Sequence, residues 1–195
     1  LKVGGPQAIR ARVQAARLLY QQGNTSQAHA LMRNLAQQQP ELQNSLTITE
    51  AEMRSNNGDP QGAIALISDA LRDQPDNTEL LYSRAMTAEK VGDMARLEKD
   101  LKRIITLNPD DASALNALGY TLGNRTDRLD EAYQYVSRAL ELRPDDPAIL
   151  DSMGWVLYQR GEPEAARDYL RRAYEKFPDP EVAAHYGEVL WVLGA

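Results

Sequence analysis

Apolar residues recur along the chain at spacings of three and four, and short polar stretches containing Gly or Pro interrupt them. The segments 8–24, 26–40 and 61–75 show this spacing clearly, which is typical of amphipathic helices of about 12–16 residues. No segment alternates apolar and polar residues in the manner of a strand, and no Asn-Gly pair stands between two such segments to compete with the helical pattern. The pattern therefore predicts an all-α protein.

The interruptions are themselves periodic. Prolines close the apolar segments at spacings of 34 or 35, at Pro40, Pro75, Pro109, Pro144 and Pro178. A turn position recurs at spacings of 33 to 35, at Gly23, Gly58, Gly92, Thr126, Gly161 and Gly194. Two series in constant phase indicate a repeat of about 34 residues, each made of two antiparallel helices.

Residues at the interruptions match helix ends. Glycine at the turn position supplies the left-handed residue that ends a helix. Asp59-Pro60 and Glu162-Pro163 each offer an acidic cap followed by a first-turn proline. Asp110-Asp111 and Asp145-Asp146 stand where the next helices begin, so capping explains these carboxylates without a catalytic role.

The repeat resembles the tetratricopeptide repeat (TPR) family. Residues 147–180 carry its signature at Leu150, Met153, Gly154, Leu157, Gly161, Ala166, Leu170, Ala173 and Pro178. The resemblance implies an α-solenoid of helix pairs forming a right-handed superhelix, with the first helices lining a concave groove. We expect a lead-in over residues 1–8, repeats over 9–43, 44–77, 78–111, 112–146 and 147–179, and the first helix of a truncated sixth repeat over 180–195.

Composition narrows the possible chemistry. The chain has 195 residues, a formal net charge of −6 and no cysteine, which excludes disulfides and thiolate chemistry. The acidic balance disfavours a nucleic-acid partner, and no apolar stretch predicts membrane insertion. His29 and His185 lack metal-ligand spacing, and no nucleophile and base form a candidate pair. We therefore predict no enzyme activity, no metal and no cofactor.

The resemblance implies that partner contacts come from three positions of each first helix, eighteen positions in all. Six of the twelve aromatic residues fall there, where even placement would give about one: Tyr20, Tyr82, Tyr120, Trp155, Tyr158 and Trp191. Packing between repeats is the alternative, and it applies above all to Tyr20 and Tyr158. We predict that a protein or peptide partner binds in the groove at Tyr82, Met86, Asn116, Tyr120, Trp155, Tyr158 and Trp191.

Two further expectations concern the groove and the last helix. Chaperone adaptors of the TPR family grip a terminal carboxylate with Lys, Asn and Arg, and here only Arg17 and Asn116 are of suitable type. We therefore predict no carboxylate clamp. In residues 180–195 we expect Ala183, Tyr186, Leu190 and Leu193 to pack on the fifth repeat. Val189, Trp191 and Val192 would then be exposed, where the chain was cut or where self-association occurs.

A narrower resemblance covers residues 151–195, which look like the late repeats of a group of proteobacterial TPR lipoproteins, one of which serves as a protease adaptor. It implies a non-catalytic adaptor on the periplasmic face of the outer membrane. Its partner would be a periplasmic carboxy-terminal processing protease or the substrates of that protease. The alternatives are a TPR accessory region of a larger enzyme and an oligomerisation module.

Overall fold

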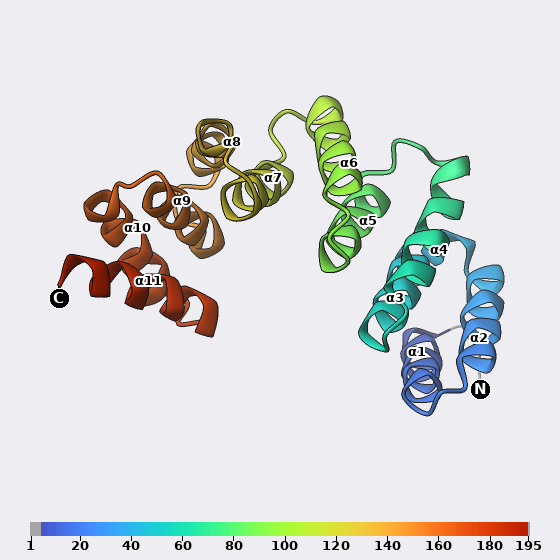
Figure 1. Ribbon diagram of the computed structural model, residues 1–195. Helices are drawn as coiled ribbons and strands as arrows, with labels where there is room; N and C mark the ends of the chain where they lie inside the picture. Colours follow the sequence, from blue (N-terminus) through green and yellow to red (C-terminus); the bar gives the residue numbers. More distant parts are fainter. Residues whose placement is uncertain (1–4, 195) are drawn as a thin grey trace. The chain divides into compact units, whose positions relative to one another are not determined.

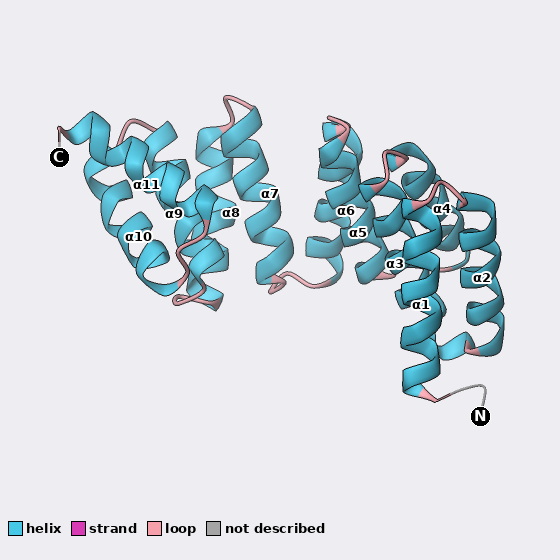
Figure 2. Cartoon of the chain, turned by 90° about the horizontal axis from the view of Figure 1, so that it is seen from below, coloured by secondary structure: helices cyan, strands magenta, loops and turns pink. Residues whose placement is uncertain are grey.

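The computed structural model describes residues 5–194, and all its regular elements in that range are helices (Figure 2). The first six elements are α1 (Pro6–Gln21), α2 (Thr25–Gln38), the 3-10 helix η1 (Pro40–Leu42), α3 (Gln43–Asn56), α4 (Pro60–Asp73) and α5 (Thr78–Lys90). The others are α6 (Met94–Leu107), α7 (Ala112–Arg125), α8 (Leu129–Leu142), α9 (Pro147–Gln159), α10 (Pro163–Lys176) and α11 (Pro180–Leu193). The predicted all-α repeat fold is confirmed.

The chain forms two compact units, one up to Asp100 and one from Leu101 onward, and the boundary falls within α6. In the first unit α1 packs on α2, and α3 packs on α4. In the second unit α7 packs on α8, and α9 packs on α7, α8, α10 and α11 (Figure 1). Within this second unit, α7, α9 and α11 follow one another on one side, with α8 and α10 on the other.

Helix ends use the chemistry that the sequence indicates, with two exceptions. Gly58 and Gly161 have φ of 86° and 81°, the left-handed region that side chains disfavour. Thr126 stands where the other repeats have glycine, and the turn there is different. Its Oγ1 donates to the Leu122 carbonyl and accepts from the Arg128 amide. Glu162 was expected to cap α10, but its side chain caps no helix and instead pairs with Arg160.

Four carboxylates at Asp-Asp pairs divide into two kinds. Asp111 accepts the Ala114 amide and Asp146 accepts the Ala148 amide, so both are N-caps. Asp110 pairs with Arg138, and Asp145 pairs with Lys176. Capping therefore accounts for one member of each pair, and an ion pair for the other.

Small residues permit the closest helix contacts. A Cβ added at Gly119 would lie 2.5 Å from a methyl carbon of Val136 on α8 and 2.9 Å from the Ala132 carbonyl oxygen. A Cβ at Gly154 would lie 2.5 Å from Leu170 on α10. At Gly187, the matching position of α11, an added Cβ would meet nothing within 4 Å.

The packing face of α11 differs from the expected one. Val182, His185 and Val189 are buried, whereas Ala183 is exposed. Val189 was expected to be exposed, so that prediction was wrong; Trp191 and Val192 are exposed as expected. The reason is that α11 turns the side carrying His185 toward α9, where the ring stacks on Trp155 and pairs with Asp151.

Candidate functional site

Five of the seven predicted partner-binding residues lie on the first helices of the second unit. Asn116 and Tyr120 belong to α7, Trp155 and Tyr158 to α9, and Trp191 to α11. The other two, Tyr82 and Met86, lie partly exposed on α5, in the first unit. The second unit therefore holds most of the candidate site.

Four rings from α7, α9 and α11 form a continuous series: those of Tyr120, Trp155, Tyr158 and His185. We call these four residues, together with Asn116 and Trp191, the aromatic face. The Trp155 ring stacks on His185 at 4.0 Å between centroids and lies 5.3 Å from Tyr158. His185 lies 6.3 Å from Tyr120. Such offset and tilted ring contacts add to the stability of the packing between helices.

Exposure separates the residues of this face into two groups. Trp155 is only 8% exposed, and its indole N–H donates to Asn124. Its ring therefore lies at the floor of the face, stacked on His185 of the next repeat. Tyr120 and Tyr158 are partly exposed, and Trp191 is 84% exposed. These three rings are the ones that a partner can reach.

Hydroxyl groups at the edge of the face bind carboxylates of α11. The Tyr120 hydroxyl donates to Glu181 at 2.6 Å, and the Tyr158 hydroxyl donates to Glu188 at 3.0 Å. The hydrogen bond to Glu188 raises the pKa of the Tyr158 hydroxyl, and desolvation and the negative charge of Glu188 raise it further. Asn116 Oδ1 is buried and has no hydrogen-bond partner among the described residues.

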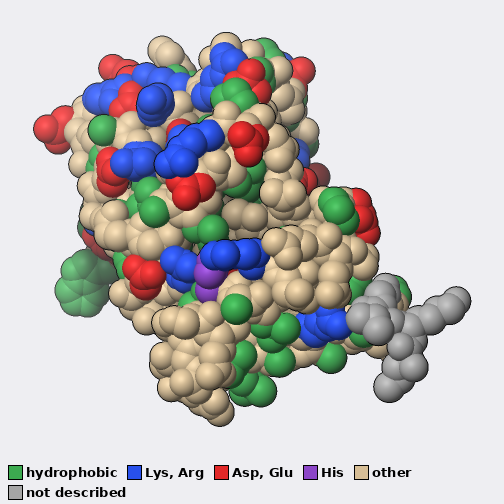
Figure 3. Space-filling model, turned by 90° about the vertical axis from the view of Figure 1, so that its right-hand side faces the viewer, with side chains coloured by type: hydrophobic (Ala, Val, Ile, Leu, Met, Phe, Trp, Pro, Cys, Tyr) green, Lys and Arg blue, Asp and Glu red, His purple; other side chains and the backbone are tan. Residues whose placement is uncertain are grey.

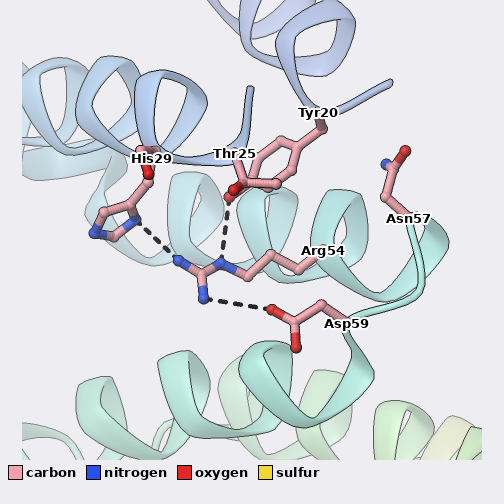
Figure 4. Close-up of a pocket in the computed structure, with 7 residues that line it drawn as sticks. Tyr20, Thr25, His29, Arg54, Asn57 and Asp59 are labelled. Carbon is pink, nitrogen blue, oxygen red and sulfur yellow. Dashed lines mark hydrogen bonds and ion pairs between the residues drawn. The ribbon is translucent and has the colours of Figure 1, made fainter. Parts of the chain in front are cut away.

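The sequence did not indicate a second feature, a pocket of about 210 Å³ in the first unit. It lies where the ends of α1 and α3 meet the starts of α2 and α4 (Figure 4). Its lining residues are Tyr20, Thr25, Ser26, His29, Arg54, Asn57 and Asp59. Figure 3 views the molecule from this end and shows a histidine among basic side chains.

A buried carboxylate organises the residues around this pocket. The Glu50 side chain belongs to a residue that is only 5% exposed. Its Oε1 accepts a hydrogen bond from the Tyr20 hydroxyl at 3.0 Å and lies 2.5 Å from Nδ1 of His29. Arg54 donates to the Tyr20 hydroxyl and pairs with Glu50 at 3.4 Å. Burial, then the charge of Glu50, raises the pKa of Tyr20 to about 12. Because Glu50 and Asp59 already form ion pairs with Arg54, the pocket is better suited to a small uncharged group than to an anion.

Among the described residues, no group of three or more His, Cys, Asp or Glu side chains is arranged to hold a metal ion. None of the described helices is both long enough and apolar enough to cross a membrane. The surface chemistry of both features is that of hydrogen bonding and ring stacking.

Comparison with known proteins assigns the family. Family models described as tetratricopeptide repeat match residues 9–34, 49–96 and 110–179. The chain belongs to the TPR family. It is 44% identical over 184 residues to the TPR repeat-containing protein PA4667 of Pseudomonas aeruginosa. That match covers 94% of this chain and 31% of the Pseudomonas protein, so the chain spans about a third of this relative.

Solved TPR structures share the fold at low sequence identity. A tetratricopeptide repeat protein from Parabacteroides merdae superposes with a TM-score of 0.73 at 16% identity, covering 96% of this chain and 74% of that chain. YrrB, described as a TPR protein with an unusual peptide-binding site, gives a TM-score of 0.63 at 21% identity, covering 91% and 90%. TPR proteins are typically non-catalytic scaffolds that bind proteins or peptides, and this chain has the repeat architecture of such a scaffold.

Proposed function

We propose that this TPR chain binds a protein or peptide segment across the aromatic face of its second unit. The observation that carries this proposal is the exposure of Trp191, at 84%, on α11, the helix whose carboxylates accept from the Tyr120 and Tyr158 hydroxyls. Large exposed aromatic side chains are costly in water and are enriched where proteins bind partners. Tyrosine and tryptophan bury a large area at a low cost in rotamer entropy.

The more specific proposal is that the chain is part of an adaptor for a periplasmic carboxy-terminal processing protease. Two observations support it: the resemblance of residues 151–195 to a group of lipoproteins, one of which serves as a protease adaptor, and the 44% identity to a TPR protein of Pseudomonas aeruginosa. In this role the chain would bind the protease or present its substrates, on the periplasmic side of the outer membrane. The aromatic face would be the contact surface.

The test is complex formation between the purified chain and the carboxy-terminal processing protease of the same organism. Calorimetric titration should show a complex that Trp191→Ala weakens by about 2 kcal/mol, as expected for an exposed aromatic anchor. Phe177→Ala is the matched control, because Phe177 is also exposed, at 57%, but follows α10 outside the aromatic face. Equal effects of the two substitutions would contradict binding at the aromatic face. Absence of any complex would contradict the protease assignment.

Self-association is the second candidate function, and the apolar residues of α11 favour it. Trp191 and Val192 are both exposed, and a second copy could cover them. Sedimentation at two protein concentrations separates the candidates. A monomer at both concentrations would exclude self-association and leave partner binding as the proposed function.

A further inference from the structure

Three carboxylates at the aromatic face, Asp151, Glu181 and Glu188, have no Lys or Arg partner among the described residues. Asp151 pairs with His185 Nδ1 at 3.1 Å, and tyrosine hydroxyls hold Glu181 and Glu188. Glu181 and Glu188 are exposed, so their negative charges act together on this surface and no basic side chain in the described part of the chain neutralises them.

Most carboxylates elsewhere in the second unit form ion pairs with Lys or Arg. Asp110 pairs with Arg138 at 2.6 Å, and Asp130 pairs with Arg160 at 2.6 Å. The sequence explains this separation of charge. The second helix α10 carries four Lys or Arg residues, whereas α9 and α11 carry none. The basic side chains are concentrated away from the aromatic face, which leaves it acidic.

The neighbouring groups favour the same kind of ligand. Aromatic rings present negative electrostatic potential at their faces, and the partly exposed rings of Tyr120 and Tyr158 stand beside the carboxylates of α11. The face therefore offers acceptors and π-surfaces, which together attract a cationic group rich in N–H donors.

We propose that the aromatic face recognises an arginine side chain of the partner segment. A guanidinium group is planar and always charged, so it can stack on a tyrosine ring while donating to a carboxylate at its edge. Glu181 and Glu188 would accept from the guanidinium, and the rings of Tyr120 and Tyr158 would contact its flat face. This inference rests on the proposed function and adds the chemistry of the residue that is bound.

The test uses three synthetic peptides, acetyl-Leu-Gly-X-Gly-Leu-amide, in which X is arginine, citrulline or glutamate. Citrulline keeps the shape of arginine and removes its charge. The two tryptophans of the chain both belong to the second unit, so their two indole N–H signals in NMR spectra report on the aromatic face directly. The arginine peptide should shift these signals, with an affinity at least about fivefold higher than that of the citrulline peptide.

Substitutions of carboxylate groups test which negative charges bind the arginine peptide. Replacing both carboxylates, by Glu181→Gln with Glu188→Gln, should weaken binding of the arginine peptide by about three- to tenfold. Glu164→Gln is the matched control, because it removes one exposed carboxylate from α10 and should leave the affinity unchanged. Circular dichroism should show the same helical content in every variant, since all three side chains are exposed.

The outcomes separate this inference from the proposed function. Equal binding of the arginine, citrulline and glutamate peptides would overturn arginine recognition, while peptide binding at the aromatic face would stand. No indole shift with the arginine peptide up to about 10 mM would overturn it as well, because even weak recognition is detectable there. The proposed function is tested separately by the calorimetric titration with the partner protein. It would fail if Trp191→Ala left the affinity for that partner unchanged.

Discussion

Replacing Gly119 by alanine should destabilise the second unit, and the same substitution at Gly187 should not. Both glycines lie within the first helix of a repeat, on α7 and α11 respectively. At Gly119 the new Cβ would lie 2.5 Å from a Val136 methyl carbon, 2.9 Å from the Ala132 carbonyl oxygen and 3.0 Å from the Val136 amide nitrogen. Two of these three atoms belong to the α8 backbone, so a change of rotamer cannot relieve the contact.

The magnitude is the sum of two opposing effects. Overpacking of this kind costs about 1–3 kcal/mol. Alanine in a helix interior gains about 1 kcal/mol over glycine. Gly119→Ala should therefore lower the free energy of unfolding by up to about 2 kcal/mol. At Gly187 only the gain applies, because nothing lies within 4 Å of the added Cβ, so stability should rise by up to about 1 kcal/mol.

Urea unfolding followed by tryptophan fluorescence measures both variants, because both tryptophans lie in the second unit. The difference between the two variants cancels the helix propensity of alanine and leaves the cost of the close contact. Helical repeats can unfold in parts, so circular dichroism should be recorded alongside to detect separate loss of α11. If Gly119→Ala proved as stable as Gly187→Ala, the idea that close approach of α8 requires glycine would be refuted.

Three further predictions address buried charge, a titrating tyrosine and helix capping. Asp100 is 1% exposed and binds Arg84 through two hydrogen bonds of 2.7 Å, so Asp100→Ala should cost about 3–5 kcal/mol in urea unfolding. Replacing both residues by Leu and Met should recover most of that loss. The pKa of Tyr20 is raised from 10.0 to about 12, so its contribution to stability is complete below pH 10 and is lost as the pH rises through about 12. Tyr20→Phe should make unfolding less dependent on pH in that range. Asp111→Ala should lower the melting temperature through loss of an N-cap worth about 1 kcal/mol, whereas Asp110→Ala, which removes an exposed ion pair, should have a smaller effect.

The repeat pattern could be predicted because it depends on local signals. Helix length follows from the apolar spacing, and helix ends follow from residues such as Gly58, Gly161, Asp111 and Asp146, which act within three or four residues of themselves. The failed expectation at Glu162 has the same origin. Its side chain had an equally close alternative in Arg160, and a short sequence window does not rank a cap against an ion pair.

The polar networks could not be predicted from local signals, because their members lie one repeat apart. Tyr20 and Arg54 are 34 residues apart, as are Asp151 and His185, and both pairs are hydrogen-bonded. Residues separated by one period occupy matching places on neighbouring first helices, so their side chains meet when repeats stack. The repeat period therefore predicts which residues can meet, whereas the metal-ligand spacing of a histidine along one helix says nothing about contacts between repeats.

The exposure of a residue in the groove depends on what the next repeat supplies. Trp155 and Trp191 were both expected to face a partner, yet one is 8% exposed and the other 84%. His185 of α11 covers the ring of Trp155, whereas no ring among the described residues stacks on Trp191. A position within the repeat therefore fixes the direction of a side chain but not its accessibility. We therefore expect substitutions at the exposed rings of Tyr120, Tyr158 and Trp191 to affect partner binding, and a substitution at Trp155 to affect packing.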